Sequence, residues 1–471
     1  MNRLLSALPA LALLTACPSG DVAPADDDDA TEVFEPGAWM RGPPPMEAGA
    51  VGDRRALRVI AHLHSHWSHD ACDGNPQPEG QPDEDCYQSL REGLCADRID
   101  LAFLSDHPTH ATETDYATLL LHRTGDDAVE NEAGDIVATR IHCEGGHEVM
   151  LFPGVESSDM MPLALDSHVD GGYGGTTEAD QERVSAAGGL RWIAHTEERD
   201  LQTLAGMQLE GLELYQLHAN LAPDIREESL GLDPFGYLAQ IGPFFFPETN
   251  GIADPPHPDL APLGFLVLNE PSAVALETLG QDQVIGITGG TDAHQNVFPA
   301  DASDFERIDS YRRMMRWFNN WLLVPVNQEI TPDSVEQAMR GARAFVVFEV
   351  FGTPLGFDVQ MSTGHSLGDE FPWAAGLSIT VTPPSLDPRS PRGYDAPEVI
   401  TRIFHADGDG RTLLQESEGS DPVTVAIPGP GVVRAEVWIR PRHLRPYLGQ
   451  LAEDYVDVPV PWIQTGGVFV R

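Results

Sequence analysis

Short apolar runs alternate with amphipathic stretches along the chain from about residue 53 to residue 345. Apolar runs with the length and composition of β-strands occur at residues 55–61, 99–105, 148–156, 190–195, 212–217, 284–289 and 321–326. Amphipathic stretches such as 86–98 and 177–189 lie between these runs and predict helices. This alternation predicts an α/β domain over residues 53–345.

Two parts of the chain depart from this alternation. Residues 222–270 contain PFFFPE and ADPPHPDLAP, which predict an insertion that covers part of the α/β domain. From residue 346 to residue 471, apolar and polar residues alternate between Gly, Pro and Asp turns, as in FVVFEVFG and VVRAEVWIRPR. This second pattern predicts a C-terminal antiparallel β-sandwich-like domain.

The composition is strongly acidic. The chain has 471 residues, a formal net charge of −46 and no lysine, so all 28 basic residues are arginines. Such a surface repels nucleic acids and anionic membranes at long range, and we expect no nucleic-acid partner. Acidity attracts divalent cations weakly everywhere, so a specific metal site needs separate evidence.

The N-terminal 52 residues have the pattern of a targeting segment and a tether. Arg3 precedes a short apolar stretch, and Leu14-Thr15-Ala16-Cys17 resembles the lipobox of bacterial lipoproteins. We expect residues 1–16 to be a signal peptide, Cys17 to be acylated, and residues 17–52 to form an acidic, proline-rich tether. This predicts an exported protein of the cell envelope, on the outer membrane or the periplasmic face rather than the inner membrane, with the lipid as its only membrane contact. An ordinary secretory peptide is the alternative.

Four further cysteines remain: Cys72, Cys86, Cys95 and Cys143. An exported protein with an even number of cysteines is expected to form disulfides, and four cysteines allow three pairings. Cys72 and Cys86 flank a polar, proline-rich loop that a bridge would hold in place.

Histidines and carboxylates are concentrated directly after the strand-like runs. His62 and His64 alternate at the end of the first run, so both side chains point to one face. Asp106 and His107 follow the second run; Glu156, and later Asp292 and His294, follow others. Because the ends of successive strands in an α/β barrel lie together, this placement predicts a metal site with mixed nitrogen and oxygen ligands.

In chain order, these clusters resemble the PHP (polymerase and histidinol phosphatase) family of metal-dependent phosphoesterases. The matching motifs are HLH with a following Ser-His, then SDH, PGVE, a lone histidine in WIAHTEER, and TDAH, over residues 57 to 350. The resemblance implies a distorted seven-stranded (β/α)7 barrel followed by the β-rich domain. It also implies a ligand set, which comprises His62, His64, His69, His107, Glu156, His168, His195, Asp292 and His294.

Three assignments within this set stay open. The histidine pair is His62 with His64 or, in a shifted register, His64 with His66. The next ligand is His69 or Asp70. His168 matches an extra family histidine only by its place between the motifs, and a surface position fits it equally well.

The implied chemistry is hydrolysis with two or three divalent ions, Zn²⁺, Mn²⁺ or Fe²⁺. Glu156 is the candidate bridge between ions. Asp106 and His195 are the candidate catalytic residues: Asp106 orients His107 or moves protons, and His195 binds a metal or protonates the leaving group. The expected substrate is a small-molecule or polymer-derived ester, most simply a phosphorylated one. A metal-dependent amidase or carboxyl-ester hydrolase, and a non-catalytic cell-surface binding protein, are the alternatives.

Overall fold

The computed structural model describes residues 39, 45, 51–393 and 395–471. Residues 36–471 form one compact unit. The predicted signal peptide, Cys17 and almost all of the predicted tether lie outside the described residues, so those assignments stay predictions. None of the helices that the structure describes combines the length and the apolar character needed to cross a bilayer.

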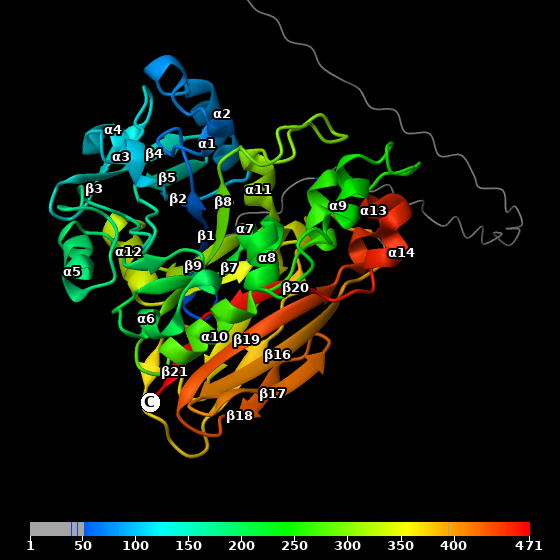
Figure 1. Cartoon of the computed structure of the whole chain (residues 1–471). Helices are drawn as coiled ribbons and strands as arrows, with labels where there is room; N and C mark the ends of the chain where they lie inside the picture. The colour runs from blue at the N-terminus through cyan, green and yellow to red at the C-terminus, as the bar shows by residue number, and fades with distance from the viewer. Residues whose placement is uncertain (1–38, 40–44, 46–50, 394) are drawn as a thin grey trace, which may run out of the picture. The chain divides into compact units, whose positions relative to one another are not determined.

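The site is built on a parallel core of six strands in the order β6-β7-β8-β1-β2-β5. Figure 1 labels β7, β8, β1, β2 and β5 of this core. All seven predicted strands of the α/β region are present. They are β1 (Arg54–Leu63), β2 (Leu101–Leu104), β5 (Glu148–Phe152), β6 (Trp192–Ile193), β7 (Gly211–Gln216), β8 (Gly286–Ala293) and β9 (Asn319–Pro325).

Strand β1 has three neighbours because it changes partner along its length. Its first half pairs antiparallel with β9, from Arg54 to Val59, and its last residues pair parallel with β8. Among the described residues, β5 and β6 are not paired with each other, so a closed seven-stranded barrel is not shown and stays a prediction. A hairpin of β3 (Asp127–Glu130) and β4 (Ile136–His142), which the sequence did not predict, extends the sheet beyond β5.

Three of the longer helices start where side chains accept the free N–H groups of the first turn. Asp83 accepts the Cys86 N–H at 2.9 Å and begins α2 (Glu84–Ala96), whose buried residues recur at three- and four-residue intervals. Capping boxes at Thr177 and Thr331 begin α5 (Glu178–Ala186) and α12 (Pro332–Arg340). The other α-helices of the α/β region are α1 (Ala71–Gly74), α3 (Pro108–Ala111), α4 (Tyr116–Leu119), α6 (Leu201–Ala205), α7 (Leu217–Leu221), α10 (Glu270–Leu279) and α11 (Tyr311–Trp317).

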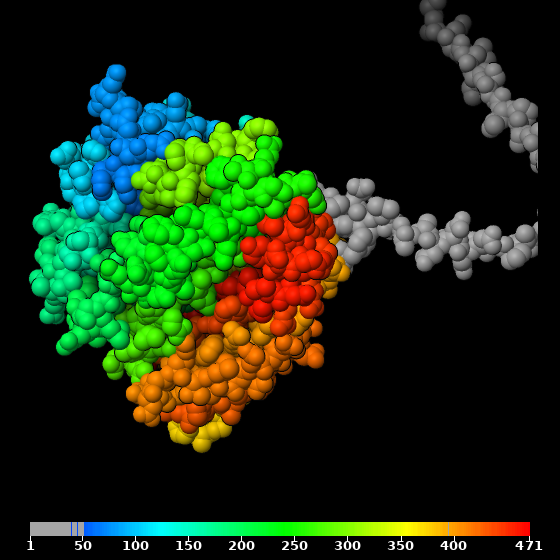
Figure 2. Space-filling model, turned by 45° about the vertical axis from the view of Figure 1, so that its right-hand side comes forward, coloured from blue at the N-terminus to red at the C-terminus, as the bar shows by residue number. Residues whose placement is uncertain are grey.

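The predicted insertion is largely helical, with α8 (Pro223–Glu228), α9 (Leu238–Phe245) and the 3₁₀ segment η4 (Pro258–Gly264). Asp259 in η4 is fully buried and forms ion pairs with Arg312, Arg313 and Arg316 around α11. The insertion also contacts the C-terminal helices α13 (Arg445–Leu448) and α14 (Ala452–Tyr455), where the His257 N–H donates to the Tyr447 carbonyl (Figure 2). Both contacts lie at residues 257–259, so they anchor the insertion near its C-terminal end.

The predicted C-terminal strands are present, but they continue the large sheet. Strand β10 (Ala344–Val347) spans the predicted boundary at residue 345 and pairs with β9 on one side and β20 (Val460–Thr465) on the other. Beyond β20 the sheet continues through β13 (Glu370–Phe371), β16 (Glu398–Asp407), β17 (Gly410–Glu418), β19 (Gly431–Arg440) and β21 (Val468–Val470).

The remaining strands form two small sheets. One contains β12 (Asp358–Met361), β14 (Ser378–Thr382) and β18 (Val423–Ala426); the other contains β11 (Pro354–Leu355) and β15 (Ser385–Leu386). Because one sheet runs through both predicted domains, the β-sandwich and the division at residue 345 stay predictions.

Candidate metal centre

The end of β1 brings His62 and His64 to the centre of the site. The pairing of β1 with β2 shifts register between Ile60 and Leu63, and His62 within this shift has a left-handed φ of 65°. Both imidazoles are fully buried, with ring centroids 5.1 Å apart. The two Nε2 atoms point to the same carboxylates, as expected from the alternation.

Glu156 and Asp292 supply those carboxylates. His62 Nε2 lies 3.1 Å from Glu156 Oε2 and 3.3 Å from Asp292 Oδ1. His64 Nε2 lies 3.0 Å from Asp292 Oδ1 and 3.5 Å from Glu156 Oε2. Two ligand atoms that each lie about 2.1 Å from one ion are about 3.0–3.4 Å apart at octahedral or tetrahedral angles, so this spacing fits a shared cation.

The Nδ1 atoms of His62 and His64 already make hydrogen bonds. His62 Nδ1 lies 2.7 Å from Glu213 Oε1, and because a carboxylate accepts, the Nδ1–H donates. Ser68 Oγ donates to Asp70 at 2.6 Å and lies 3.0 Å from His64 Nδ1, which therefore donates to it. The proton on Nδ1 leaves the Nε2 lone pair free, which is the tautomer that metal ligands need.

His107 extends the same arrangement. Its Nδ1 lies 3.2 Å from the Glu156 carbonyl, while its Nε2 lies 3.3 Å from Asp70 Oδ2 and 3.7 Å from Glu156 Oε2. Asp70, not His69, therefore offers the next donor. His69 is exposed, with its ring centroid 4.8 Å from that of His107, and it is in none of the groups of donors close enough to share an ion.

The shifted register, with His64 and His66 as the pair, does not fit the geometry. His66 Nδ1 lies 3.1 Å from the Asp83 carbonyl, and its ring packs against Trp67 and Tyr87. His66 thus belongs to the packing around α2.

A third group of donors is formed by His195, His218 and Asp292. His195 Nε2 lies 3.2 Å from Glu156 Oε1, and His218 Nδ1 lies 3.2 Å from Asp292 Oδ2. The sequence did not assign a role to His218. Its only signal was its place two residues after the strand β7, where the chain turns into α7.

Three groups of donors are linked through His64 and Asp292, and each could hold a cation; a further group, His195 with Glu197 and Glu198, shares His195. We call the residues of the three linked groups the central cluster; they are His62, His64, Asp70, His107, Glu156, His195, His218 and Asp292. His64 and Asp292 each belong to two of the groups, so the positions are adjacent. His64 Nε2 is buried without a hydrogen bond of good geometry, although Asp292 Oδ1 is 3.0 Å away. Mixed histidine and carboxylate ligation of this kind fits divalent transition metals.

The electrostatics of the central cluster favour a cation. Burial lowers the pKa of His62, but nearby carboxylates, first of all Glu213, outweigh it and hold that pKa well above its usual value. Burial raises the pKa of Glu156, yet His62 and His195 hold it well below the usual value. For His107, Asp70 and Glu156 outweigh burial and raise the pKa to about 9. A proton and a metal ion compete for these lone pairs.

Glu213 positions two parts of the central cluster. Its Oε1 accepts from His62 Nδ1, and its Oε2 accepts the backbone N–H of His195 at 2.9 Å. A Cβ at Gly290 in β8 would lie 1.9 Å from Glu213 Oε1, so only glycine leaves room for this carboxylate. The second glycine of the Gly-Gly pair before Thr291 has this steric reason.

Asp106 and His294 lie beside the central cluster. Asp106 accepts from the backbone N–H of Ser65 at 2.5 Å and from its hydroxyl at 2.8 Å, which fixes the loop between His64 and His66. Burial raises the pKa of Asp106 to about 6. His294 Nε2 lies 3.8 Å from Asp292 Oδ1, and its Nδ1 is buried without a hydrogen bond.

The predicted ligand His168 is not brought to the central cluster. Its Nδ1 is hydrogen-bonded to the Tyr173 hydroxyl, and its Nε2 lies 2.8 Å from the Thr114 carbonyl. Both ring nitrogens therefore have partners outside the central cluster, and the assignment of His168 as a ligand gains no support from this geometry. Its place between two motifs on the chain carried no information about distance in space.

The structure also pairs the four described cysteines, as the even count predicted. The disulfides are Cys72–Cys86 and Cys95–Cys143. The first lies next to the central cluster, because the Cys72 N–H donates to the His294 carbonyl at 2.9 Å.

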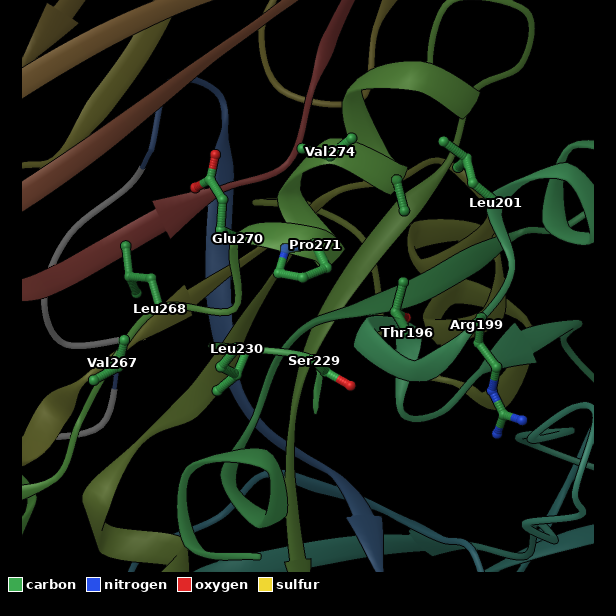
Figure 3. A pocket seen from close by; sticks show the side chains of 11 residues that line it. Thr196, Arg199, Leu201, Ser229, Leu230, Val267, Leu268, Glu270, Pro271 and Val274 are labelled. Carbon is green, nitrogen blue, oxygen red and sulfur yellow. The ribbon is translucent and has the colours of Figure 1, made fainter. Parts of the chain in front are cut away.

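Two cavities lie near the central cluster. The site cavity, of about 370 Å³, is partly lined by His218, Asp292 and His294. The α10 cavity, of about 570 Å³, lies between α10, the 3₁₀ segment η3 (Thr196–Glu198) and the residues after α8, and none of its lining residues belongs to the central cluster (Figure 3). Arg199 lines it and donates to the Ala194 and Ser158 carbonyls.

Fold and site together define a mixed α/β protein with buried histidine and carboxylate groups that could bind divalent metal ions. No family model and no curated protein matches the chain. A solved structure from Bacteroides vulgatus ATCC 8482, a two-domain protein containing a predicted PHP-like metal-dependent phosphoesterase, is similar over 90% of this chain and 100% of its own. The TM-score is 0.36 and the identity 12%, too low to carry an argument, so membership in the PHP family stays a prediction.

Proposed function

We propose that this protein is a metal-dependent hydrolase that acts on phosphoesters. One observation carries the proposal: His62, His64 and His107 each engage Nδ1 with an acceptor and direct Nε2 toward the carboxylates of the central cluster. A histidine packed for stability alone needs no such common direction. The arrangement is that of preoriented ligands.

The proposed ligands are the residues of the central cluster except His218, for two or three ions of Zn²⁺, Mn²⁺ or Fe²⁺. His294 remains a candidate ligand on the wall of the site cavity. Ions bound here would polarise a water molecule and neutralise charge on a phosphoryl group. His69 and His168 are left out, because one is exposed and the other is bonded elsewhere.

The chain's own residues hold this arrangement and supply a proton. Ser68 and Glu213 fix the rings of His64 and His62. In the proposed hydrolysis the oxygen of water joins phosphorus, the bond from phosphorus to the leaving oxygen breaks, and that oxygen takes up a proton. His218 is an exposed imidazole beside Asp292 on the wall of the site cavity, and we assign it the role of proton donor.

We also propose that the protein is exported and anchored in the cell envelope through acylated Cys17. The proposal rests on the Leu14-Thr15-Ala16-Cys17 segment and is supported by two disulfides, which persist in oxidising compartments. A net charge of −46 supports a substrate other than nucleic acid.

The test compares two histidine substitutions. His107→Asn removes a ligand of the central cluster and should lower both bound metal and turnover by at least about tenfold. His168→Asn removes the hydrogen bonds of His168 to Tyr173 and Thr114, outside the central cluster. This variant should keep the metal content and the turnover per folded molecule. The measurements are metal analysis of the purified protein and turnover of a panel of phosphate mono- and diesters, amides and carboxyl esters.

Two results would contradict the proposal. Equal metal contents in the two variants would show that His107 is not a ligand. Turnover of amides or carboxyl esters without turnover of any phosphoester would assign the same centre to acyl chemistry.

A further inference from the structure

The site cavity begins at the central cluster. Its wall includes His218, Asp292 and His294. An organic group attached to a phosphoryl group at the central cluster would therefore extend into the site cavity. At about 370 Å³ its volume lies within the range that small-molecule sites occupy.

Away from these residues the wall is apolar. It consists chiefly of Leu217, Leu221, Pro223, Tyr237, Val297 and Met314, contributed by α7, the insertion, the loop after β8, and α11. The two hydroxyls on the wall are already used. Tyr237 Oη donates to the Leu221 carbonyl at 2.9 Å, and Thr291 Oγ1 donates to the His62 carbonyl at 2.9 Å. The wall therefore has few groups that could recognise a sugar or another polar substituent.

The wall also lacks positive charge beyond the central cluster. No arginine is among the described residues that line the site cavity, and Asp224 is an exposed carboxylate on it. Arg226, two residues after Asp224, donates to the Asn220 and Asp233 carbonyls, and its guanidinium lies 5.0 Å from the Tyr237 ring centre. Arg313, next to Met314, is buried and paired with Asp259 and Asp304. A second phosphate or a carboxylate on the substrate would meet Asp224 without a counter-charge.

We propose that the site cavity binds an uncharged, apolar organic group of the substrate, alkyl or aryl, while its phosphoryl group lies at the central cluster. This inference rests on the proposed function and narrows it to phosphoesters of apolar alcohols or phenols. It excludes nucleotides and sugar phosphates as preferred substrates, because their polar groups would lose hydrogen bonds to water on entering the cavity.

Alkyl phosphonates test the proposal by binding, without turnover, because water does not cleave their carbon–phosphorus bond under these conditions. Titration calorimetry of the Mn²⁺-loaded protein would compare methyl-, propyl- and pentylphosphonate. Each methylene that enters the cavity should tighten binding about fourfold. The affinity should therefore rise by on the order of a hundredfold from methyl- to pentylphosphonate.

A matched pair of variants locates the apolar group. Val297 lines the site cavity and Val274 lines the α10 cavity, and the two valines are similarly exposed, at 43% and 42%. Val297→Asn adds no charge and should weaken pentylphosphonate about fivefold while leaving methylphosphonate within about twofold. Val274→Asn should change neither affinity.

The outcomes separate the two proposals. If methylphosphonate binds but affinity does not rise with chain length, the inference fails and the proposed function stands. If Val274→Asn weakens pentylphosphonate and Val297→Asn does not, the apolar group lies in the α10 cavity and the inference is overturned. If no phosphonate binds the Mn²⁺-loaded protein, the phosphoester function fails as well.

Discussion

Three residues of the central cluster hold backbone conformations that side chains rarely adopt. His62, His195 and Asp292 have φ angles of 65°, 50° and 48°. A non-glycine residue in the left-handed region costs about 1–3 kcal/mol, so each needs support from its surroundings. Glu213 supplies part of it by binding the His62 side chain and the His195 N–H. The strain turns these side chains inward at the ends of their strands.

The neighbours His69 and Asp70 should respond differently to the same substitution. Asp70→Asn replaces a donor 3.3 Å from His107 Nε2 with a neutral amide and should lower metal affinity about tenfold or more. His69→Asn changes an exposed ring and should leave affinity within about twofold. Competition with a chromogenic chelator measures both. The opposite order would restore His69 as the ligand.

Metal binding should depend steeply on pH. In the metal-free protein the pKa of His107 is raised to about 9, so its imidazole is protonated at pH 7 and must lose that proton to bind a cation. Affinity should therefore rise with pH, by about tenfold per unit for each proton displaced, up to about pH 9. Calorimetry with Mn²⁺ between pH 6 and 8, in buffers of different ionisation enthalpy, measures the proton release. A flat profile would show that no such proton is displaced.

Much of the site could be predicted at the level of residue type. His62, His64 and His107 stood out because each follows a strand-like run, and parallel strands end at one edge. The sequence singled out Glu213 on its strand and favoured a supporting role over a ligand role, which agrees with its bonds to His62 and the His195 N–H. His218 could not be placed in this way. Its role depends on the distance between β7 and β8 in space, which no spacing along the chain reports, and the same limit applies to His168.

At the scale of elements, seven of the nine strands β1 to β9 were predictable because apolar runs mark them. The hairpin β3–β4 was missed, since Asp127–Glu130 is mostly exposed and has no apolar run to mark it. The sequence also could not predict which strands pair. Arg54–Val59 pairs antiparallel with β9, whereas Ala61 and Leu63 pair parallel with β8. Apolar periodicity identifies a strand but not its neighbours.

The two disulfides should have separable roles. Removal of the disulfide Cys95–Cys143, whose cysteines are 48 residues apart, should lower the free energy of unfolding by about 4 kcal/mol. Removal of Cys72–Cys86, whose cysteines are 14 residues apart, should lower it by about 3 kcal/mol. The loss of metal affinity should follow the opposite order and be larger when Cys72–Cys86 is removed. Cys72 binds the His294 carbonyl and lies two residues after Asp70, whereas the second bridge ties α2 to the end of β4.

Double serine variants of each pair provide the comparison, with denaturant unfolding for stability and chelator competition for metal affinity. A larger loss of affinity in the Cys95→Ser/Cys143→Ser protein would contradict the separation. Thiol titration of the unfolded, unreduced wild-type chain should find almost no free thiol.

At the scale of the whole molecule, Cys17 is the proposed attachment point. Acyl chains contribute about 0.8 kcal/mol per buried methylene, so several chains would hold the protein on a membrane. Cys17→Ser should move the protein from the membrane fraction to the soluble fraction of the producing cell, as measured by fractionation and immunoblotting. A variant that still pellets with membranes and is processed identically would contradict acylation at this residue.

One acidic residue of the insertion is paired with three arginines inside the fold. Asp259 is buried against Arg312, Arg313 and Arg316, which hold the insertion to α11 and so shape one side of the site cavity. The sequence predicted an insertion but not this anchor, because residues more than 50 positions apart meet only in the folded chain.

Strand β10 bears on how the gene for this protein could be divided or recombined. Its residues Ala344–Val347 lie between β9 and β20, so the α/β region and the C-terminal strands complete one sheet. A chain ended at residue 345 would cut β10 in two and leave the β9 side of the sheet with an open edge prone to self-association. Recombination therefore cannot freely exchange the segment of the gene that encodes the C-terminal strands. We expect the two parts to fold only as one chain, because β10 pairs with β9 on one side and β20 on the other.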